Sequence, residues 1–171
     1  KAIIAVHFAG MPCDMDKIQK IATKYKIPII EDAACAAGAS YKGKTAGSLG
    51  IGASFSFHPR KSITTGEGGM VTTNDEALWR AMWSFKDHGK SYEAVYERHH
   101  PPGFRWLHES FGTNWRMLEM QAAIGRIQLK RMQDWTAARG RNARAISDSC
   151  KKFPALRGNP SKKTANGSAE S

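Results

Sequence analysis

The sequence has few cysteines, no long apolar run and a shortage of acidic residues. No apolar stretch approaches the roughly 18 residues that a membrane-spanning helix requires, so we expect no membrane partner. The three cysteines, Cys13, Cys35 and Cys150, form no Cys-x-x-Cys pair, which argues against a disulfide framework and a structural zinc site. We therefore expect reduced thiols, a cytoplasmic location and no metal.

Basic residues exceed acidic ones: 26 Lys and Arg face 15 Asp and Glu, a formal net charge of +11, with most of the excess in residues 98–171. Such an excess attracts polyanions and phosphorylated ligands. A solvated helix face with a polar tail gives the same pattern, and no nucleic-acid-binding signature is present. We expect small-molecule ligands and no nucleic acid, with a basic binding domain as an alternative.

The apolar pattern predicts an α/β chain. Residues 2–7 read as a buried strand, a helix follows from a cap at Asp14 or Asp16 to about Lys26, and residues 27–31 read as a second strand. This βαβ order indicates a parallel sheet. We also expect a loop or hairpin at 38–50 and strands at 51–57 and 70–73. A helix should then run from a cap at Asn74 or Asp75 to about Lys86, followed by an irregular segment at 87–113. The last expected element is a helix from about Arg116 to Cys150, with Gly140 as a candidate break.

Residues 38–45, Gly-Ala-Ser-Tyr-Lys-Gly-Lys-Thr, match the pattern of a phosphate-binding P-loop. That function needs a strand directly before the loop and a helix whose amino terminus meets the phosphates. Residues 46–52 contain three glycines, which disfavour a helix start. We therefore disfavour a nucleotide hydrolase.

Lys61 and Asp32 are of the residue types that hold pyridoxal 5'-phosphate (PLP). Asp32 follows one predicted strand and Lys61 follows another, and parallel sheets place ligands at the carboxyl ends of their strands. The lysine would hold the cofactor as an imine, and the aspartate would keep its ring nitrogen protonated. Ser56 is a candidate phosphate donor. Taken singly, a lysine is more often a surface residue and an aspartate a helix cap.

Several stretches, in this order, resemble the DegT/DnrJ/StrS family of nucleotide-sugar aminotransferases. They are Ile-Glu-Asp-Ala-Ala at 30–34, residues 41–44 and 47–50, Phe-Ser-Phe-His-Pro-Arg-Lys at 55–61, and residues 64–74, 87–89 and 112–125. The resemblance implies the three-layer α/β/α sandwich of the type I PLP-dependent transferase large domain, here incomplete. It places residues 1–137 in that domain, 138–158 at the start of a small C-terminal domain and 159–171 in a disordered tail.

The resemblance also implies roles for single residues. Lys61 would bind the cofactor and move the proton, Asp32 would bind the ring nitrogen and Ser56 the phosphate. Asn114 would reach the phosphate of the neighbouring subunit's cofactor, which makes a homodimer the working unit. Cys35 stands where many members have Gln or His beside the ring, and a thiol is a weaker hydrogen-bond partner. Candidates for nucleotide or sugar contacts are His88, His99, His100 and Arg105.

The implied reaction moves an amino group from an amino acid, with glutamate as the expected donor, to a nucleotide-linked keto sugar for surface polysaccharide or related synthesis. Two alternatives stay open. A PLP-dependent sugar dehydratase is one, although such relatives carry histidine where this chain has Lys61. The other is a non-catalytic fragment, because family members are longer and a strand begins almost at Lys1.

Overall fold

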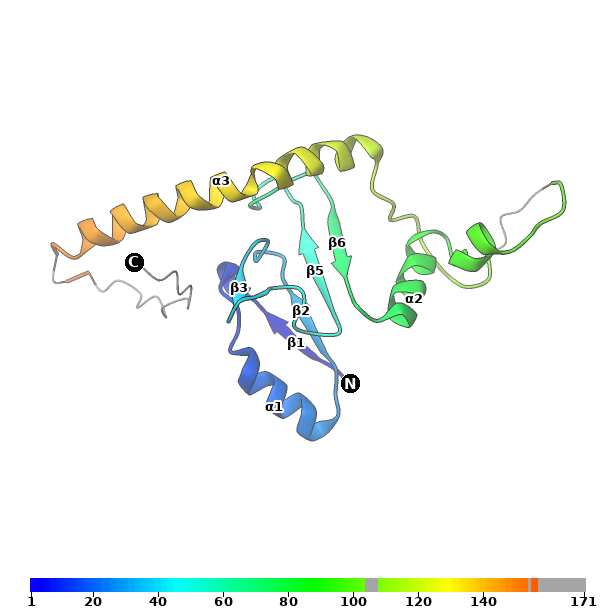
Figure 1. The fold of residues 1–171 in the computed structure, drawn as a ribbon, viewed down its shortest axis with the longest axis horizontal. Coiled ribbons are helices and arrows are strands. Elements are labelled where there is room, and N and C mark those ends of the chain that lie inside the picture. The colour runs from blue at the N-terminus through cyan, green and yellow to red at the C-terminus, as the bar shows by residue number, and fades with distance from the viewer. Residues whose placement is uncertain (104–107, 154, 157–171) are drawn as a thin grey trace.

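Figure 1 shows the computed structural model of the chain, which describes residues 1–103, 108–153 and 155–156. Its centre is a four-stranded sheet in the order β1-β2-β5-β6. These strands are β1 (Ile3–Val6), β2 (Ile29–Asp32), β5 (Gly52–Ser56) and β6 (Gly69–Thr72). The candidate Arg105 and the expected tail at 159–171 lie outside the described residues.

The first three strands form the predicted parallel sheet. β1 pairs with β2 and β2 with β5, both in parallel, and helix α1 (Met15–Tyr25) connects β1 to β2. The Asp14 side chain accepts the Lys17 amide and caps α1, as the sequence predicts. Parallel pairing brings the carboxyl ends of β2 and β5 to one edge, which positions Asp32 beside the turn that follows β5.

The last strand, β6, runs antiparallel to β5. The expectation that residues 2–7 form a buried strand is wrong for one face of β1. Ala5 is buried, whereas Ile4 and Val6 are 66% and 50% exposed. Alternate side chains of a strand point to opposite faces, so β1 buries only the face that packs against Met15 and Ala22 of α1.

The P-loop-like segment forms a hairpin instead of a nucleotide-binding loop. Strands β3 (Ser40–Tyr41) and β4 (Lys44–Thr45) pair antiparallel. Lys42 and Gly43 form the turn between them, both with positive φ. No helix follows at residues 46–52, so the context that a P-loop requires is absent there.

Helix α2 (Glu76–Lys86) begins after its predicted cap, Asp75, whose side chain accepts the Leu78 amide. The irregular segment after α2 contains a π-helical turn, Glu93–Glu97, that the sequence pattern does not reveal. Aromatic contacts pack this segment on α2, with ring centroids 5.1–5.8 Å apart; they join Trp79 and Trp83 of the helix to Tyr92 and Tyr96.

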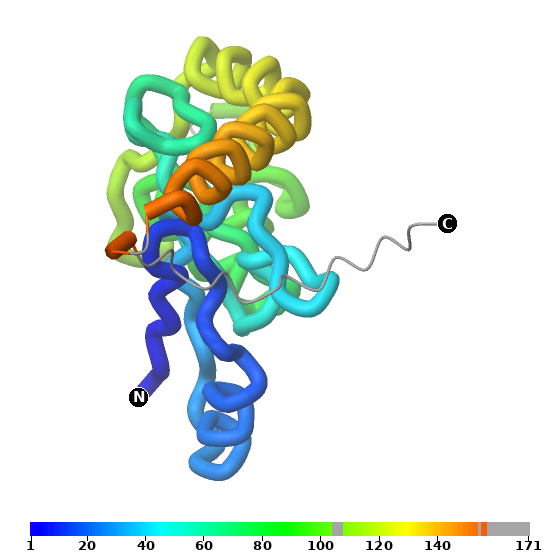
Figure 2. The backbone as a smooth tube through the Cα atoms, turned by 90° about the vertical axis from the view of Figure 1, so that its left-hand side faces the viewer, coloured from blue at the N-terminus to red at the C-terminus, as the bar shows by residue number. Residues whose placement is uncertain are grey.

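Helix α3 (Glu119–Cys150) is a single 32-residue helix. The candidate break at Gly140 is wrong: one glycine costs about 1 kcal/mol relative to alanine in a helix, which does not end it. α3 lies at the opposite end of the molecule from α1 (Figures 1 and 2). The proposed boundary between residues 137 and 138 falls inside this helix and stays a prediction. None of the helices in the described ranges is apolar enough over a sufficient length to cross a bilayer.

A buried carboxylate joins three parts of the sheet. Glu31 of β2 is fully buried, and its Oε2 lies 2.9 Å from His7 Nε2. The backbone amides of residues 47, 49 and 50 donate to the same carboxylate at 2.6–2.7 Å. His7 Nδ1 accepts the Cys13 amide, so the ring proton lies on Nε2 and points at Glu31. Burial alone would raise the pKa of Glu31, but these donors outweigh it and hold that pKa below its ordinary value of 4.5.

We predict that Glu31→Gln lowers the free energy of unfolding of the full-length protein by about 3–5 kcal/mol at pH 7, because buried donors lose their charged acceptor. Since the folded pKa is depressed, the contribution of Glu31 is complete above pH 4.5 and is lost as the pH falls through the lower, folded value. Urea unfolding at pH 7 and at pH 3–4 measures both effects. Asp134→Asn on exposed α3 is the control, and an equally small change in both variants would contradict the role of Glu31.

Candidate functional site

The Lys61 amine contacts Cys35. Lys61 lies in the turn after β5, where its amide donates to the His58 carbonyl at 2.9 Å. Its Nζ donates to Cys35 Sγ at 3.1 Å. The two residues are 26 positions apart, and they meet because β2 and β5 are neighbouring parallel strands that end at the same edge. The structure thus brings together two of the residues that the sequence singled out.

Asp32 is the last residue of β2 and lies directly before the segment that carries Cys35. Its Oδ1 accepts the Ala34 amide at 3.0 Å. Within the described ranges no group donates a hydrogen bond to Oδ2. Ala33 and Ala36, on either side of Cys35 in this segment, are buried. One carboxylate oxygen therefore remains available to a ligand at the carboxyl edge of the sheet.

Ser56 is the last residue of β5, at the start of the turn that holds Lys61. Its Oγ accepts the His58 amide at 3.3 Å, which leaves the hydroxyl proton to donate. The turn closes on itself, because the Phe57 amide donates to Gly68 and the Phe57 carbonyl accepts from Thr64 Oγ1, both at 2.8 Å. Lys61 thus lies in a folded turn with internal hydrogen bonds.

Helix α3 holds this turn from outside. Gln128 Oε1 accepts the Thr64 amide, and Gln121 Nε2 donates to the Glu67 carbonyl, both at 2.8 Å. A side chain at Gly125 would meet Thr65 at 3.0 Å, so α3 lies close to the turn. The sequence analysis missed both glutamines. Their spacing of seven residues, which places them on one helix face, was the only available signal.

The other candidates lie on the segment around α2, away from this cluster. Asn114 forms a bridge with Asp87, and its Oδ1 accepts Arg116 Nε at 3.2 Å. Among the described residues, no hydrogen bond or ion pair joins Asn114, His88, His99 or His100 to Lys61, Asp32 or Cys35. His100 Nε2 lies 2.6 Å from the Ala94 carbonyl, and the His88 carbonyl lies 2.7 Å from His108 Nδ1. Their expected ligand contacts stay predictions.

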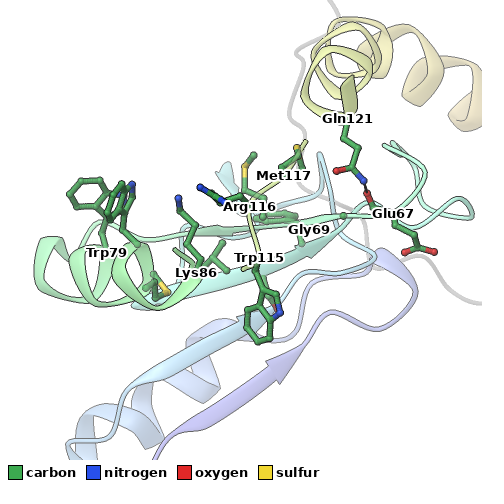
Figure 3. Close-up of a pocket in the computed structure, with 15 residues that line it drawn as sticks. Glu67, Gly69, Trp79, Lys86, Trp115, Arg116, Met117 and Gln121 are labelled. Atoms are coloured by element: carbon green, nitrogen blue, oxygen red, sulfur yellow. Dashed lines mark hydrogen bonds between the residues drawn. The ribbon is translucent and has the colours of Figure 1, made fainter. Parts of the chain in front are cut away.

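Three cavities border the turn. One, about 400 Å³, lies between residues 63–65 of the turn and α3. Another, about 650 Å³, lies over β5 and β6 and is lined by Trp79 and Lys86 of α2 and by Trp115, Arg116 and Met117 (Figure 3). It contains none of Lys61, Asp32 and Cys35. Lys61 instead lines a smaller cavity of about 370 Å³ between its turn and α3. Asp32, Cys35 and Ser56 line none of these cavities, and the Lys61 amine contacts Cys35.

The chain is similar to proteins of one known family. The model of the DegT/DnrJ/EryC1/StrS aminotransferase family matches residues 1–169. GDP-perosamine synthase of Caulobacter vibrioides is 46% identical over 141 residues, which are 82% of this chain and 35% of that protein. The chain is also similar to the X-ray structure of the aminotransferase from Psychrobacter cryohalolentis, with 64% sequence identity and a TM-score of 0.87. The match covers 90% of this chain and 39% of that one.

A Streptococcus pneumoniae protein, solved in a PLP-form and a PMP-form, is 28% identical with TM-scores of 0.68 and 0.67; the match covers 78% of this chain and 37% of that one. The predicted fold class is confirmed, since these neighbours share the type I fold of PLP-dependent aminotransferases. The chain spans little more than a third of their length.

The cofactor of this family is PLP, and the residues present fit it. The Lys61 amine has no carboxylate partner among the described residues, so it is available to an aldehyde. Asp32 offers one unoccupied carboxylate oxygen to a ring nitrogen, and Ser56 offers a hydroxyl to a phosphate. The fold, this donor set and a family match that runs through nearly the whole sequence agree: the chain belongs to the DegT/DnrJ/EryC1/StrS aminotransferase family.

Proposed function

We propose that this chain carries the cofactor-binding lysine of an enzyme that transfers an amino group from an amino acid, with glutamate as the donor, to a nucleotide-linked keto sugar. The product would serve surface polysaccharide or related sugar synthesis. The observation that carries the proposal is the contact of Lys61 Nζ with Cys35 Sγ at 3.1 Å, three residues after Asp32 at the carboxyl edge of the sheet. The presence of Lys61 favours amino transfer over the dehydratase alternative.

When bound, PLP supplies a protonated ring that accepts the electron pair left when a substrate C–H bond breaks. Lys61 would hold the cofactor through its aldehyde carbon, and its free amine would carry a proton between the substrate carbon and the cofactor carbon. Asp32 keeps the ring nitrogen protonated through its unoccupied oxygen. Cys35 orients the amine, because Nζ donates to its sulfur. Ser56 would donate to the phosphate.

We also propose a homodimer in which Asn114 reaches the partner's cofactor. Asn114 lies between large exposed apolar side chains: Phe111 is 97% exposed and Trp115 is 70% exposed. Exposed apolar patches mark protein interfaces.

A cytoplasmic location fits the three free cysteines of the described chain. His88, His99, His100 and Arg105 remain the proposed contacts for nucleotide or sugar.

The central test is the attachment of PLP to Lys61. Reduction of the PLP-loaded full-length protein with borohydride should fix the cofactor on the peptide that contains Lys61, as read by mass spectrometry. Lys61→Ala should bind no PLP covalently and should not convert glutamate to its keto acid. Arg60→Ala changes the neighbouring charge and should leave attachment intact. Attachment to another lysine in the wild-type protein would exclude the assignment.

Cys35 lies close enough to the amine for its modification to matter. Alkylation of the Cys35 thiol with iodoacetamide should prevent PLP binding, because the added group would occupy the space beside Lys61. Cys35→Ser should bind PLP and resist this inactivation, while Cys13 and Cys150 remain available to the reagent. PLP absorbance after gel filtration measures the bound fraction. Full PLP binding by protein alkylated at Cys35 would contradict the proposed contact.

Asn114 tests the dimer. Asn114→Ala should weaken PLP binding about 10-fold, the cost of one hydrogen bond to a charged group, and only where two subunits associate. A mixed dimer of Asn114→Ala and Lys61→Ala subunits should hold one site with both functional residues and one with neither. Equal PLP loss by Asn114→Ala in a demonstrably monomeric state would rule out a role across the interface.

A further inference from the structure

Cys35 and Lys61 form a thiol–amine pair whose redox chemistry the proposed amino transfer does not use. Lys61 Nζ lies 3.1 Å from Cys35 Sγ. That separation falls in the range of roughly 3–3.5 Å at which two reacting atoms are poised to form a bond. The sulfur and the nitrogen therefore need little movement to become covalently joined.

Backbone turns hold both partners in this position. The Ala36 amide donates to the Ala33 carbonyl at 2.9 Å, which closes a turn around Cys35, and the Lys61 amide closes a turn of its own. A side chain at Gly10 would meet the Cys35 carbonyl oxygen at 2.8 Å, so the loop before α1 packs directly against the Cys35 backbone. The contact between sulfur and nitrogen thus depends on two fixed turns and not on a mobile segment.

Cys35 is the exposed one of the three cysteines, whereas Cys13 and Cys150 are half-buried. The Cys13 thiol donates to the Val6 carbonyl at 3.0 Å, and burial raises the pKa of that thiol. Oxidants react with accessible thiolates, and a raised pKa lowers the thiolate fraction. A soluble peroxide should therefore oxidise Cys35 before Cys13.

We propose that Cys35 and Lys61 are the site of an oxidative cross-link, a sulfenamide bond between Sγ and Nζ that forms in the PLP-free protein. Hydrogen peroxide is the oxidant: it converts the Cys35 thiol to a sulfenic acid and releases one water. The unprotonated Lys61 amine then attacks the sulfur, so that the S–N bond forms and the S–O bond breaks. The hydroxyl leaves with one amine proton as a second water. The sulfur loses two electrons, the peroxide accepts them, and each side chain has lost one hydrogen.

The cross-link occupies the amine that the proposed function assigns to PLP. Condensation with an aldehyde requires a primary amine, and the sulfenamide nitrogen retains only one hydrogen. The oxidised protein therefore cannot attach PLP at Lys61, and PLP already attached there protects the lysine from cross-linking. Added thiols reduce the S–N bond and restore both side chains. This consequence for PLP rests on the proposed function, whereas the cross-link itself does not.

The first test treats PLP-free full-length protein with hydrogen peroxide and reads its tryptic peptides by mass spectrometry without reductant. We expect the peptides that contain Cys35 and Lys61 to be joined, with a mass about 2 Da below their sum, and dithiothreitol should separate them. Lys61→Arg is the matched control, because its guanidinium keeps the charge and does not become a free amine. In that variant, Cys35 should instead be labelled by dimedone, a reagent for sulfenic acids. Wild-type Cys35 that stays a free thiol, or that takes up dimedone without joined peptides, would overturn the proposal.

PLP binding gives a second readout, which separates this inference from the proposed function. The fraction of PLP binding lost after peroxide treatment should equal the cross-linked fraction and should return with dithiothreitol. Cys35→Ser cannot form the cross-link and should bind PLP to the same extent before and after peroxide. PLP attached to Lys61 in a wild-type protein that forms no cross-link would overturn the inference and leave the aminotransferase function standing. A cross-link in a wild-type protein that binds no PLP before oxidation would retain the inference and reject the proposed function.

Discussion

The buried Glu31 carboxylate is the interaction on which the rest of the site depends. Removing a carboxylate from water costs several kcal/mol unless donors surround it, and Glu31 receives His7 and three backbone amides. These donors come from the end of β1 and from the loop before β5, so one side chain fixes three strands relative to one another. Because strand side chains alternate between faces, the next residue, Asp32, points to the other side of the sheet. A structural carboxylate thus directly precedes the carboxylate that we assign to the cofactor.

Helix α3 provides the second constraint. Its glutamines hold the turn that carries Lys61, and the same helix face continues into the cavity lined by Trp135 and Arg139. The helix therefore holds the turn that carries Lys61 and also forms one wall of a cavity beside that turn. A change on α3 can alter chemistry at Lys61 without touching the sheet.

Local patterns predicted most of the fold. Caps at Asp14 and Asp75 and the apolar runs located α1, α2 and the sheet strands to within a few residues, since these signals depend on near neighbours in sequence. The family resemblance placed Lys61 and Cys35 at one cofactor, but it did not predict their direct contact. The pairing of His7 with Glu31 could not be predicted, because partners 24 residues apart leave no local trace. The charged Glu31 directly after the apolar run at 27–30 was the only hint. The glutamine contacts of α3 also depend on tertiary packing.

We propose that Asp32 and Lys61 hold one cofactor between them. The decisive test is a crystal structure of the full-length protein crystallised with PLP. We predict electron density continuous from Lys61 Nζ to the cofactor, with the ring nitrogen facing the Asp32 carboxylate and Cys35 beside the ring. Density for PLP bound elsewhere, or a ring nitrogen directed away from Asp32, would contradict the account.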